Sequence, residues 1–278
     1  MKSIKWSLMM MMALLFAIAP AQSWAKKKIT LRYKLEKGAV YIFNSKVDQN
    51  MQMKVMSNTV NTHTAVAIEQ ASKVSAATAD QFTMTNTIEK MVMDVSSMGI
   101  NMHIDSSDPS TYAAGREKMV GETMDKVIGK PFDLSLNQYG KITSTDLGEL
   151  SKSLASLGDK NDQTNFTIFP ENKIEIGESW VSDLNAGKGL LVHNKYTLVK
   201  ASGNTAELSV DGTISSDGAN EKITNVSGIQ TGTILIDLKT GMTIKATLNQ
   251  EIKMEVSQSG MTIPAHITSI INLNVKKK

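Results

Sequence analysis

The sequence contains no cysteine. This absence excludes disulfide bonds, thiolate nucleophiles and zinc sites built on thiolates. It also excludes the lipid-bearing cysteine that a bacterial lipoprotein needs directly after its signal. The folded chain must therefore be stable without covalent cross-links.

The chain also has a small net charge and few aromatic side chains. The formal net charge is +3, and it falls to +1 without Lys2 and Lys5. Such a weak field does not attract nucleic acid, so we expect no nucleic-acid partner. Aromatic residues make up 5% of the chain, whereas outer-membrane barrels carry aromatic girdles at both interfaces. The composition favours a soluble protein.

Motifs for catalysis and metal binding are absent. The chain has neither HExxH nor GxSxG, and its four histidines, His63, His103, His193 and His266, do not share metal-ligand spacing. Most of them fall on the polar phase of predicted strands, where a histidine is simply solvated. We predict no catalytic residue, no metal site and no cofactor, and we expect that the protein is not an enzyme.

The first 25 residues have the pattern of a cleaved secretory signal. Lys2 and Lys5 precede an apolar run of about 12 residues, and Ser23-Trp24-Ala25 forms a small-x-small cleavage site. Cleavage after Ala21 is the alternative. The run is shorter than the about 20 residues that span a bilayer, so no transmembrane segment should remain after cleavage. We expect residues 26–278 to lie in the periplasm or outside the cell, soluble or peripherally attached to the envelope.

Strict period-2 alternation dominates the remaining 253 residues. Around residues 41–55, 60–74 and 243–256 apolar side chains alternate with polar ones, which is typical of half-buried strands. In the segment 81–95 the apolar positions change from even to odd numbers, which predicts a bulge near Glu89. Further strands are predicted at 81–95, 99–105, 131–136, 190–200, 206–214, 231–238 and 263–275.

Two capped amphipathic helices are predicted between these strands. The first begins after Asp108-Pro109, extends to about residue 128, and ends at Gly129. The second begins at Asp146 and ends at Gly158, near residues 146–157. Because short hairpin turns link most strands, sequential neighbours should be antiparallel.

The predicted fold is therefore mainly β: one curled antiparallel sheet, a barrel or half-barrel, with two inserted helices. Residues 26–278 form a single domain in this prediction. Its two halves, about 29–145 and 174–275, share weak motifs such as Gly38 with Tyr41 and Gly177 with Trp180. Duplication is one interpretation, and convergence of β hairpins is the other.

Four motifs occur in the same order as in the pattern of a known family. They are Leu31-x-Tyr33-x-Leu35-x-x-Gly38, Phe132-x-Leu-x-Leu-x-x-x-Gly140-Lys-Ile, Phe169-Pro170 with Ile176-Gly177-Glu178-Ser179-Trp180, and Gly232-x-Ile234-x-Ile236-Asp237-Leu-x-Thr240-Gly241. The chain resembles the exported bacterial proteins of domain of unknown function 6263, frequent in Bacteroidota. That resemblance implies an exported protein and transfers no functional residue.

Methionine is the one residue that is unusually abundant, and 13 methionines remain after signal cleavage. Thioether side chains fill ordinary cores, but they also adapt to irregular apolar ligands. One hypothesis is an apolar pocket for a lipid or another apolar small molecule, with the first helix over its mouth. Its residues would be Met51, Met53, Ile68, Phe82, Met84, Met119, Met124, Leu248, Ile252 and Met254.

The alternative is a non-catalytic structural or protein-interaction component of the cell envelope, with unknown partners and a filled interior. A cavity larger than about 300 Å³ distinguishes the two hypotheses, because ligand sites have at least that volume.

Overall fold

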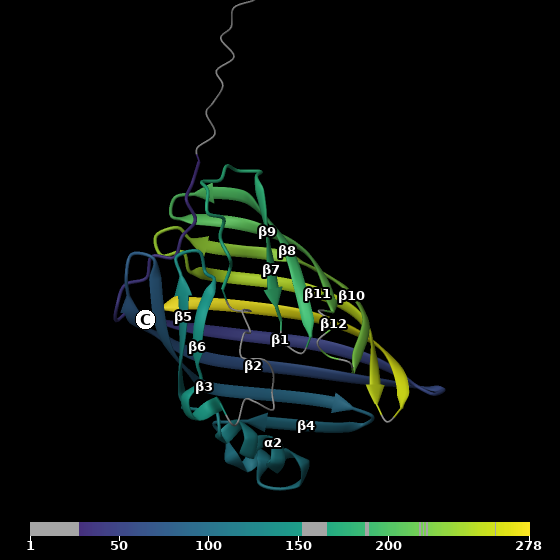
Figure 1. The fold of residues 1–278 in the computed structure, drawn as a ribbon. Coiled ribbons are helices and arrows are strands. Elements are labelled where there is room, and N and C mark those ends of the chain that lie inside the picture. Colours follow the sequence, from purple (N-terminus) through teal and green to yellow (C-terminus); the bar gives the residue numbers. More distant parts are fainter. Residues whose placement is uncertain are drawn as a thin grey trace, which may run out of the picture.

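The computed structural model describes residues 28–151, 166–186, 189–216, 218, 220, 222–258 and 260–278. The predicted signal at residues 1–25 lies outside this part of the chain. Within it, one antiparallel sheet of twelve strands dominates the fold (Figure 1). The strand order is β6-β5-β3-β2-β1-β12-β11-β10-β9-β8-β7, and β4 pairs with β3 off this path.

The strands are long, and most match the alternating segments of the sequence. Their bounds are β1 (Val40–Val55), β2 (Asn58–Ala77), β3 (Gln81–Ser97), β4 (Ile100–Asp105), β5 (Pro131–Asn137), β6 (Ile142–Asp146), β7 (Ser179–Asn185), β8 (Leu190–Ser202), β9 (Thr205–Ser216), β10 (Ile223–Asp237), β11 (Thr243–Gln258) and β12 (Met261–Lys277).

Alternation does not predict β7, because Val181 and Leu184 lie on opposite phases of this strand. The bulge predicted in β3 is confirmed, since the register with β2 shifts as it passes Glu89. A further shift separates Val74 from Ala76. Bulges increase local twist and bend a strand, which helps this sheet to curl.

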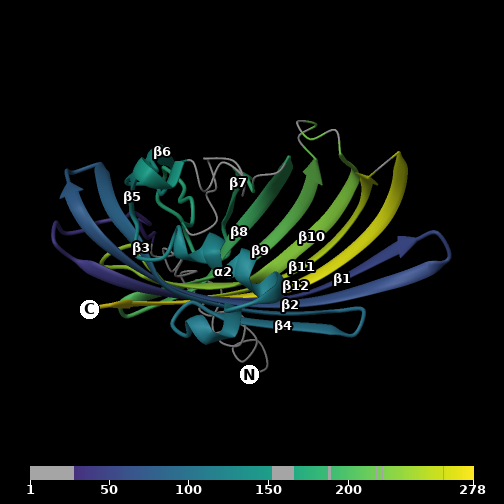
Figure 2. The same cartoon turned by 90° about the horizontal axis from the view of Figure 1, so that it is seen from below.

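The sheet is curled but not closed. Its order ends at β6 on one side and β7 on the other, and Figure 2 shows it as a trough with one concave face. The fold is therefore the open form of the predicted curled sheet, not the barrel. Successive side chains alternate between the concave and the convex face.

The helical regions are shorter than predicted. A 3₁₀ turn, η1 (Pro109–Tyr112), begins at the predicted cap, where the Asp108 carboxylate accepts a hydrogen bond from the Ser110 N–H. Helix α2 (Gly115–Asp125) follows separately. The break occurs because Gly115 has a φ of +71°, which a continuous right-handed helix does not allow.

The second predicted helix is described only at its start. A 3₁₀ turn, η2 (Gly148–Leu150), follows Asp146, whose carboxylate accepts the Gly148 N–H at 3.0 Å. Residues 152–157 of that prediction lie outside the described residues. The described part of the chain thus contains one α-helix, where the sequence predicts two.

Two extended segments, residues 29–35 and 166–174, fill one end of the concave face, which we call the filled end. The Tyr33 N–H donates to the Gln138 carbonyl and the Lys34 N–H to the Thr240 carbonyl, both at 2.8 Å. These acceptors belong to the turns after β5 and β10. The main core lies here, including Leu31, Tyr33, Leu198, Leu208 and Ile236, each at most 1% exposed.

The opposite end of the concave face, which we call the far end, has a smaller core. Its buried residues are Val192, Ile214, Ile252, Met254 and Ala265, between 3% and 8% exposed. Neither of the two filling segments belongs to this cluster.

The strands of each predicted half are neighbours in the sheet. β1 to β3, β5 and β6 lie together on one side, β7 to β12 lie on the other, and β1 pairs with β12 where they meet. Duplication of the two halves stays a prediction.

Candidate ligand-binding cavity

A cavity of about 390 Å³ lies on the concave face next to the filled end. Most of its wall is apolar, none of its lining residues carries a charge, and strands from both halves of the chain contribute to it. The lining residues are Phe43, Ser45, Val47, Ile68, Gln70, Ile88, Phe166, Thr167, Leu184, Ala186, Val192, Asn194, Tyr196, Val210, Gln230, Ile234, Thr243, Ala246, Leu248, Gln250, Ile271 and Leu273.

Three side-chain amides form a hydrogen-bonded row along one wall. Gln250 on β11 donates through Nε2 to Oε1 of Gln230 on β10 at 2.6 Å. Gln230 donates through Nε2 to Oδ1 of Asn194 on β8 at 2.9 Å. Asn194 in turn donates through Nδ2 to the Tyr196 hydroxyl at 3.3 Å. We call Asn194, Gln230 and Gln250 the amide row.

Strand register explains why these residues meet. Asn194 and Gln230 both pair with Gly212 on β9, and Gln230 pairs with Gln250. The same register continues to Ser269 on β12 and Gln49 on β1. Residues paired across strands share a face, so this is a polar line across the concave face between the two apolar ends.

Gly212 makes the longest step in the row possible. Asn194 and Gln230 lie on strands two apart, about 10 Å from each other at a spacing of about 4.8 Å between neighbours. A Cβ at Gly212 would overlap Oδ1 of Asn194. The absence of a side chain at this position leaves the space over β9 in which the two amides meet.

A second group of polar side chains lies on the opposite wall. Gln70 on β2 lines the cavity, and its Nε2 donates to the Ser72 hydroxyl at 3.1 Å and to Oδ1 of Asn86 at 3.0 Å. Ser72 and Asn86 are fully buried. Burial also raises the pKa of Tyr196, which keeps its hydroxyl protonated. Both walls therefore carry a few polar groups and no charged ones.

Phe166 and Thr167, in one of the filling segments, close the side of the cavity toward the filled end. The Tyr33 hydroxyl accepts the Thr167 N–H at 3.1 Å and donates to the Thr167 carbonyl at 3.3 Å. Phe166 also contacts the rings of Tyr33 and Phe43, with centroids 5.9 and 6.1 Å apart. These contacts hold this wall in place.

The structure does not bring all the predicted pocket residues together. Ile68 and Leu248 line the cavity, whereas Phe82 and Met84 are buried in the core of the filled end. Met53, Ile252 and Met254 belong to the cluster at the far end. Met51 lines a separate hollow of about 400 Å³ with His63 and His266.

Helix α2 does not cover the cavity, in contrast to the prediction. Met124 packs with Ile104 and Tyr112 against the methionines of β3 and β4, and Met119 is 71% exposed. No residue of α2 lines the cavity. The helix lies beside β4 because its apolar side chains bury Ile104, which lies on the concave side of that strand.

All four histidines are partly exposed, and each pairs with a carboxylate on the adjacent strand. The distances are 3.2 Å for His63 to Asp48, 2.6 Å for His103 to Asp94 and 3.0 Å for His266 to Glu251. His193 pairs with Asp183 in the same way. The described residues contain no cluster of three or more groups suited to a metal ion.

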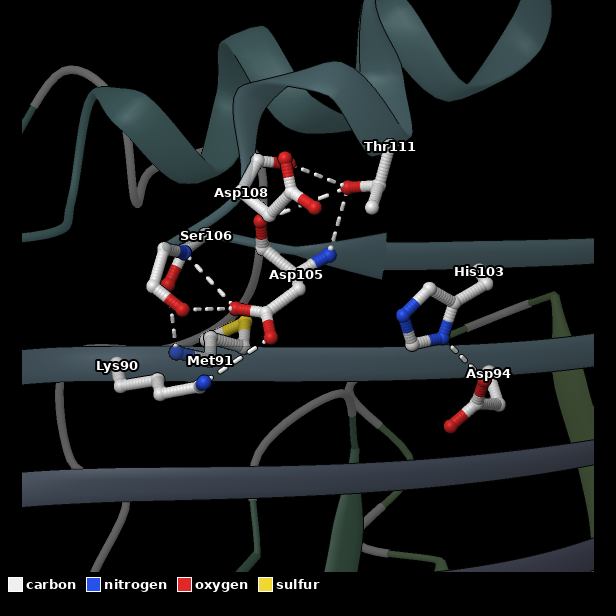
Figure 3. A network of polar contacts seen from close by, with 9 residues as sticks. Lys90, Met91, Asp94, His103, Asp105, Ser106, Asp108 and Thr111 are labelled. Carbon is white, nitrogen blue, oxygen red and sulfur yellow. Dashed lines mark hydrogen bonds and ion pairs between the residues drawn. The ribbon is translucent and has the colours of Figure 1, made fainter.

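A polar network at the corner between β4 and η1 involves Asp105 and Asp108 and fixes the chain there, as Figure 3 shows. Lys90 lies 2.9 Å from the Asp105 carboxylate. Hydrogen bonds from the Ser107 hydroxyl and N–H, followed by the effect of Lys90, lower the pKa of Asp105 to about 2. An ionised, fully engaged carboxylate suits a structural role better than proton transfer.

The amide row is the part of the site that sequence reasoning misses. Gln250 stands on the apolar phase of its strand, between Leu248 and Ile252, and Asn194 stands likewise between Val192 and Tyr196. A polar residue on the apolar phase was the available signal. A search for apolar periodicity alone does not detect such a residue.

Part of the sequence matches a family model, and two of the four motifs lie within the matched part. Residues 159–243 match the model of a family of unknown function, DUF6263. This match supports membership of the DUF6263 family. The matched range contains the motifs at Phe169–Pro170, Ile176–Trp180 and Gly232–Gly241, whereas the motifs near Leu31 and Phe132 lie outside it.

No curated protein matches this chain. Among solved structures, one that describes lipid–protein interactions in lipovitellin is 9% identical with a TM-score of 0.54. The alignment covers 87% of this chain and only 25% of the lipovitellin chain. An outer membrane channel from Pseudomonas putida F1 is 8% identical over 88% of this chain and 97% of its own, with a TM-score of 0.25. At these identities the lipovitellin match shows a shared fold only.

The described part of the chain has no helix with the length and apolar character needed to cross a membrane.

Proposed function

We propose that this protein is a non-catalytic binding protein that holds an apolar, lipid-like ligand on the concave face of its curled sheet. The observation that carries the proposal is the cavity of about 390 Å³, whose wall is mostly apolar and uncharged. Its volume falls within the range of small-molecule sites. The fold shared with lipovitellin, described in terms of lipid–protein interactions, supports the same reading.

A binding assay with a cavity-filling variant tests this proposal. Ala246 is 7% exposed and lines the cavity, so Ala246→Phe should fill part of it. We expect saturable binding of the neutral dye Nile red by residues 26–278, weakened about tenfold or more in the variant. The matched control is Ala67→Phe, because Ala67 pairs with Lys46 on the convex face.

Three outcomes would count against the cavity. They are no saturable binding by the wild type, no lipid bound to protein purified from its own host, and a folded Ala246→Phe variant that binds as the wild type does. Native mass spectrometry detects the copurified lipid. The first two results together would favour the structural or protein-interaction alternative, for which the tight packing of the filled end is the supporting observation.

We also propose that the protein acts outside the cytoplasm after removal of residues 1–25. The support is the sequence of that segment, with its lysines, apolar run and Ser23-Trp24-Ala25 site. N-terminal sequencing of the native protein should begin at Lys26. Retention of Met1 on an exported product would contradict this cleavage.

A further inference from the structure

The amide row has more hydrogen-bonding groups than it uses internally. Each carboxamide carries two N–H donors and one carbonyl acceptor. The contacts along the row engage one N–H of Gln250, one of Gln230 and one of Asn194. The carbonyl of Gln250, at the start of the row, receives no hydrogen bond from the row itself. A polar group placed against Gln230 and Gln250 would find both donors and an acceptor.

An apolar chain in the cavity would not satisfy these groups. It would displace water from the amides without replacing the hydrogen bonds of that water, which disfavours a plain hydrocarbon. Asn194 and Gln230 are 1% and 5% exposed, so they reach little water elsewhere. The residues of the row are thus arranged for a ligand that is polar at this point.

A charged group would also be disfavoured. The cavity lining contains no arginine, lysine, histidine, aspartate or glutamate, and its hydroxyl at Tyr196 stays neutral. A carboxylate or ammonium would lose its hydration without gaining an opposite charge. The polar group that fits the row is therefore neutral.

We infer that the cavity selects a neutral lipid whose head group both donates and accepts hydrogen bonds, through hydroxyl and ester or amide groups. This inference rests on the proposed function and specifies its ligand class. The head group lies against Gln230 and Gln250, and the acyl chain lies along the apolar wall that includes Val210, Ile234 and Leu248.

Competition for bound Nile red tests the head-group preference in the wild type. The competitors share a chain of 18 carbons and differ in their heads: 1-oleoylglycerol is neutral and hydrogen-bonding, oleate is charged, and 1-octadecene has no polar head. We expect 1-oleoylglycerol to displace the dye at a concentration about tenfold or more below the other two, since a site built for hydrogen bonds rejects analogues that lack them.

The variant Gln250→Leu links that preference to the amide row. It should lower the preference for 1-oleoylglycerol over 1-octadecene by about fivefold or more, while 1-octadecene binds at least as well as before. The control Asn249→Leu changes the exposed neighbour of Gln250 on the convex face and should keep the wild-type order.

The possible results distinguish failure of the neutral-head inference from failure of both proposals. Oleate or 1-octadecene binding as well as 1-oleoylglycerol in the wild type would overturn the neutral-head inference and leave apolar binding intact. An unchanged order in a folded Gln250→Leu variant would also overturn it. Absence of Nile red binding in the wild type would overturn both. The wild-type comparison stands even where a variant does not fold.

Discussion

The two ends of the concave face share several strands but are completed differently. At the filled end, residues 29–35 and 166–174 lie on the sheet, and Leu198, Leu208 and Ile236 are completely buried. At the far end, Ile252 and Met254 keep 7% and 8% exposure. Among the described residues, the sheet therefore has its most completely buried core where the two filling segments cover it.

This difference also places the cavity. It lies next to the described filling segments, between Phe166 and the amide row. The residues that carry the family resemblance, including Tyr33, Phe169 and Gly241, belong to the filled end or contact it directly. We infer that the family motifs mainly specify the support of the cavity, and Ile234 of the fourth motif also lines it.

The largest expected effect compares two leucines on the concave face. Leu208 is 0% exposed in the filled end, whereas Leu248 is partly buried beside the cavity. Leu208→Ala should lower the free energy of unfolding by about 4 kcal/mol and Leu248→Ala by about 2 kcal/mol, because the tightly packed site leaves a new void. Urea denaturation of both variants measures the difference. Equal losses would show that the two regions are packed alike.

Two turn glycines offer a comparison at matched backbone geometry. Gly241 and Gly260 both have a φ of +77°, but a Cβ at Gly241 would overlap the Arg32 backbone, and one at Gly260 would meet nothing. Gly260→Ala should cost about 1 kcal/mol from backbone strain alone. Gly241→Ala should cost about 3 kcal/mol, since it also displaces a filling segment. Thermal unfolding of the pair checks this, and similar midpoints would contradict the contact with Arg32.

A smaller loss is expected when one of the links between the two filling segments is removed. Tyr33→Phe removes the hydroxyl that bonds both the N–H and the carbonyl of Thr167, and it leaves these buried groups unpaired. The expected cost is about 2 kcal/mol. Tyr112→Phe is the control outside the filled end, because the Tyr112 hydroxyl bonds Asp125 in a less buried place. A larger loss for Tyr112→Phe would reverse the ranking.

The smallest effect concerns pH and the corner beside α2. Because the pKa of Asp105 falls from 3.8 to about 2 on folding, its ionised form stabilises the native state above about pH 4. That contribution is lost as the pH falls from about 4 toward 2. The unfolding midpoints of wild type and Asp105→Asn should differ at pH 5 and converge near pH 2. A gap that does not change with pH would exclude this role of Asp105.

Much of the fold follows from local patterns in the sequence. Alternation locates most strands, the change of phase in residues 81–95 locates the bulge at Glu89, and Asp108 marks the start of η1. Each of these features depends on residues close together in the chain. The prediction that the first helix covers the pocket was wrong. An amphipathic stripe shows that a helix packs against a surface, but it does not show which surface.

The sequence by itself determined that this is a strand-rich chain that resembles DUF6263, because side-chain alternation and turn glycines are local properties. Only the tertiary structure decided that the sheet stays open, that residues 29–35 and 166–174 fill one end, and that Asn194, Gln230 and Gln250 form a row. Those residues are separated by whole strands, and the register that aligns them depends on the length of every intervening hairpin. Gly212 contributes to that row through the side chain it lacks.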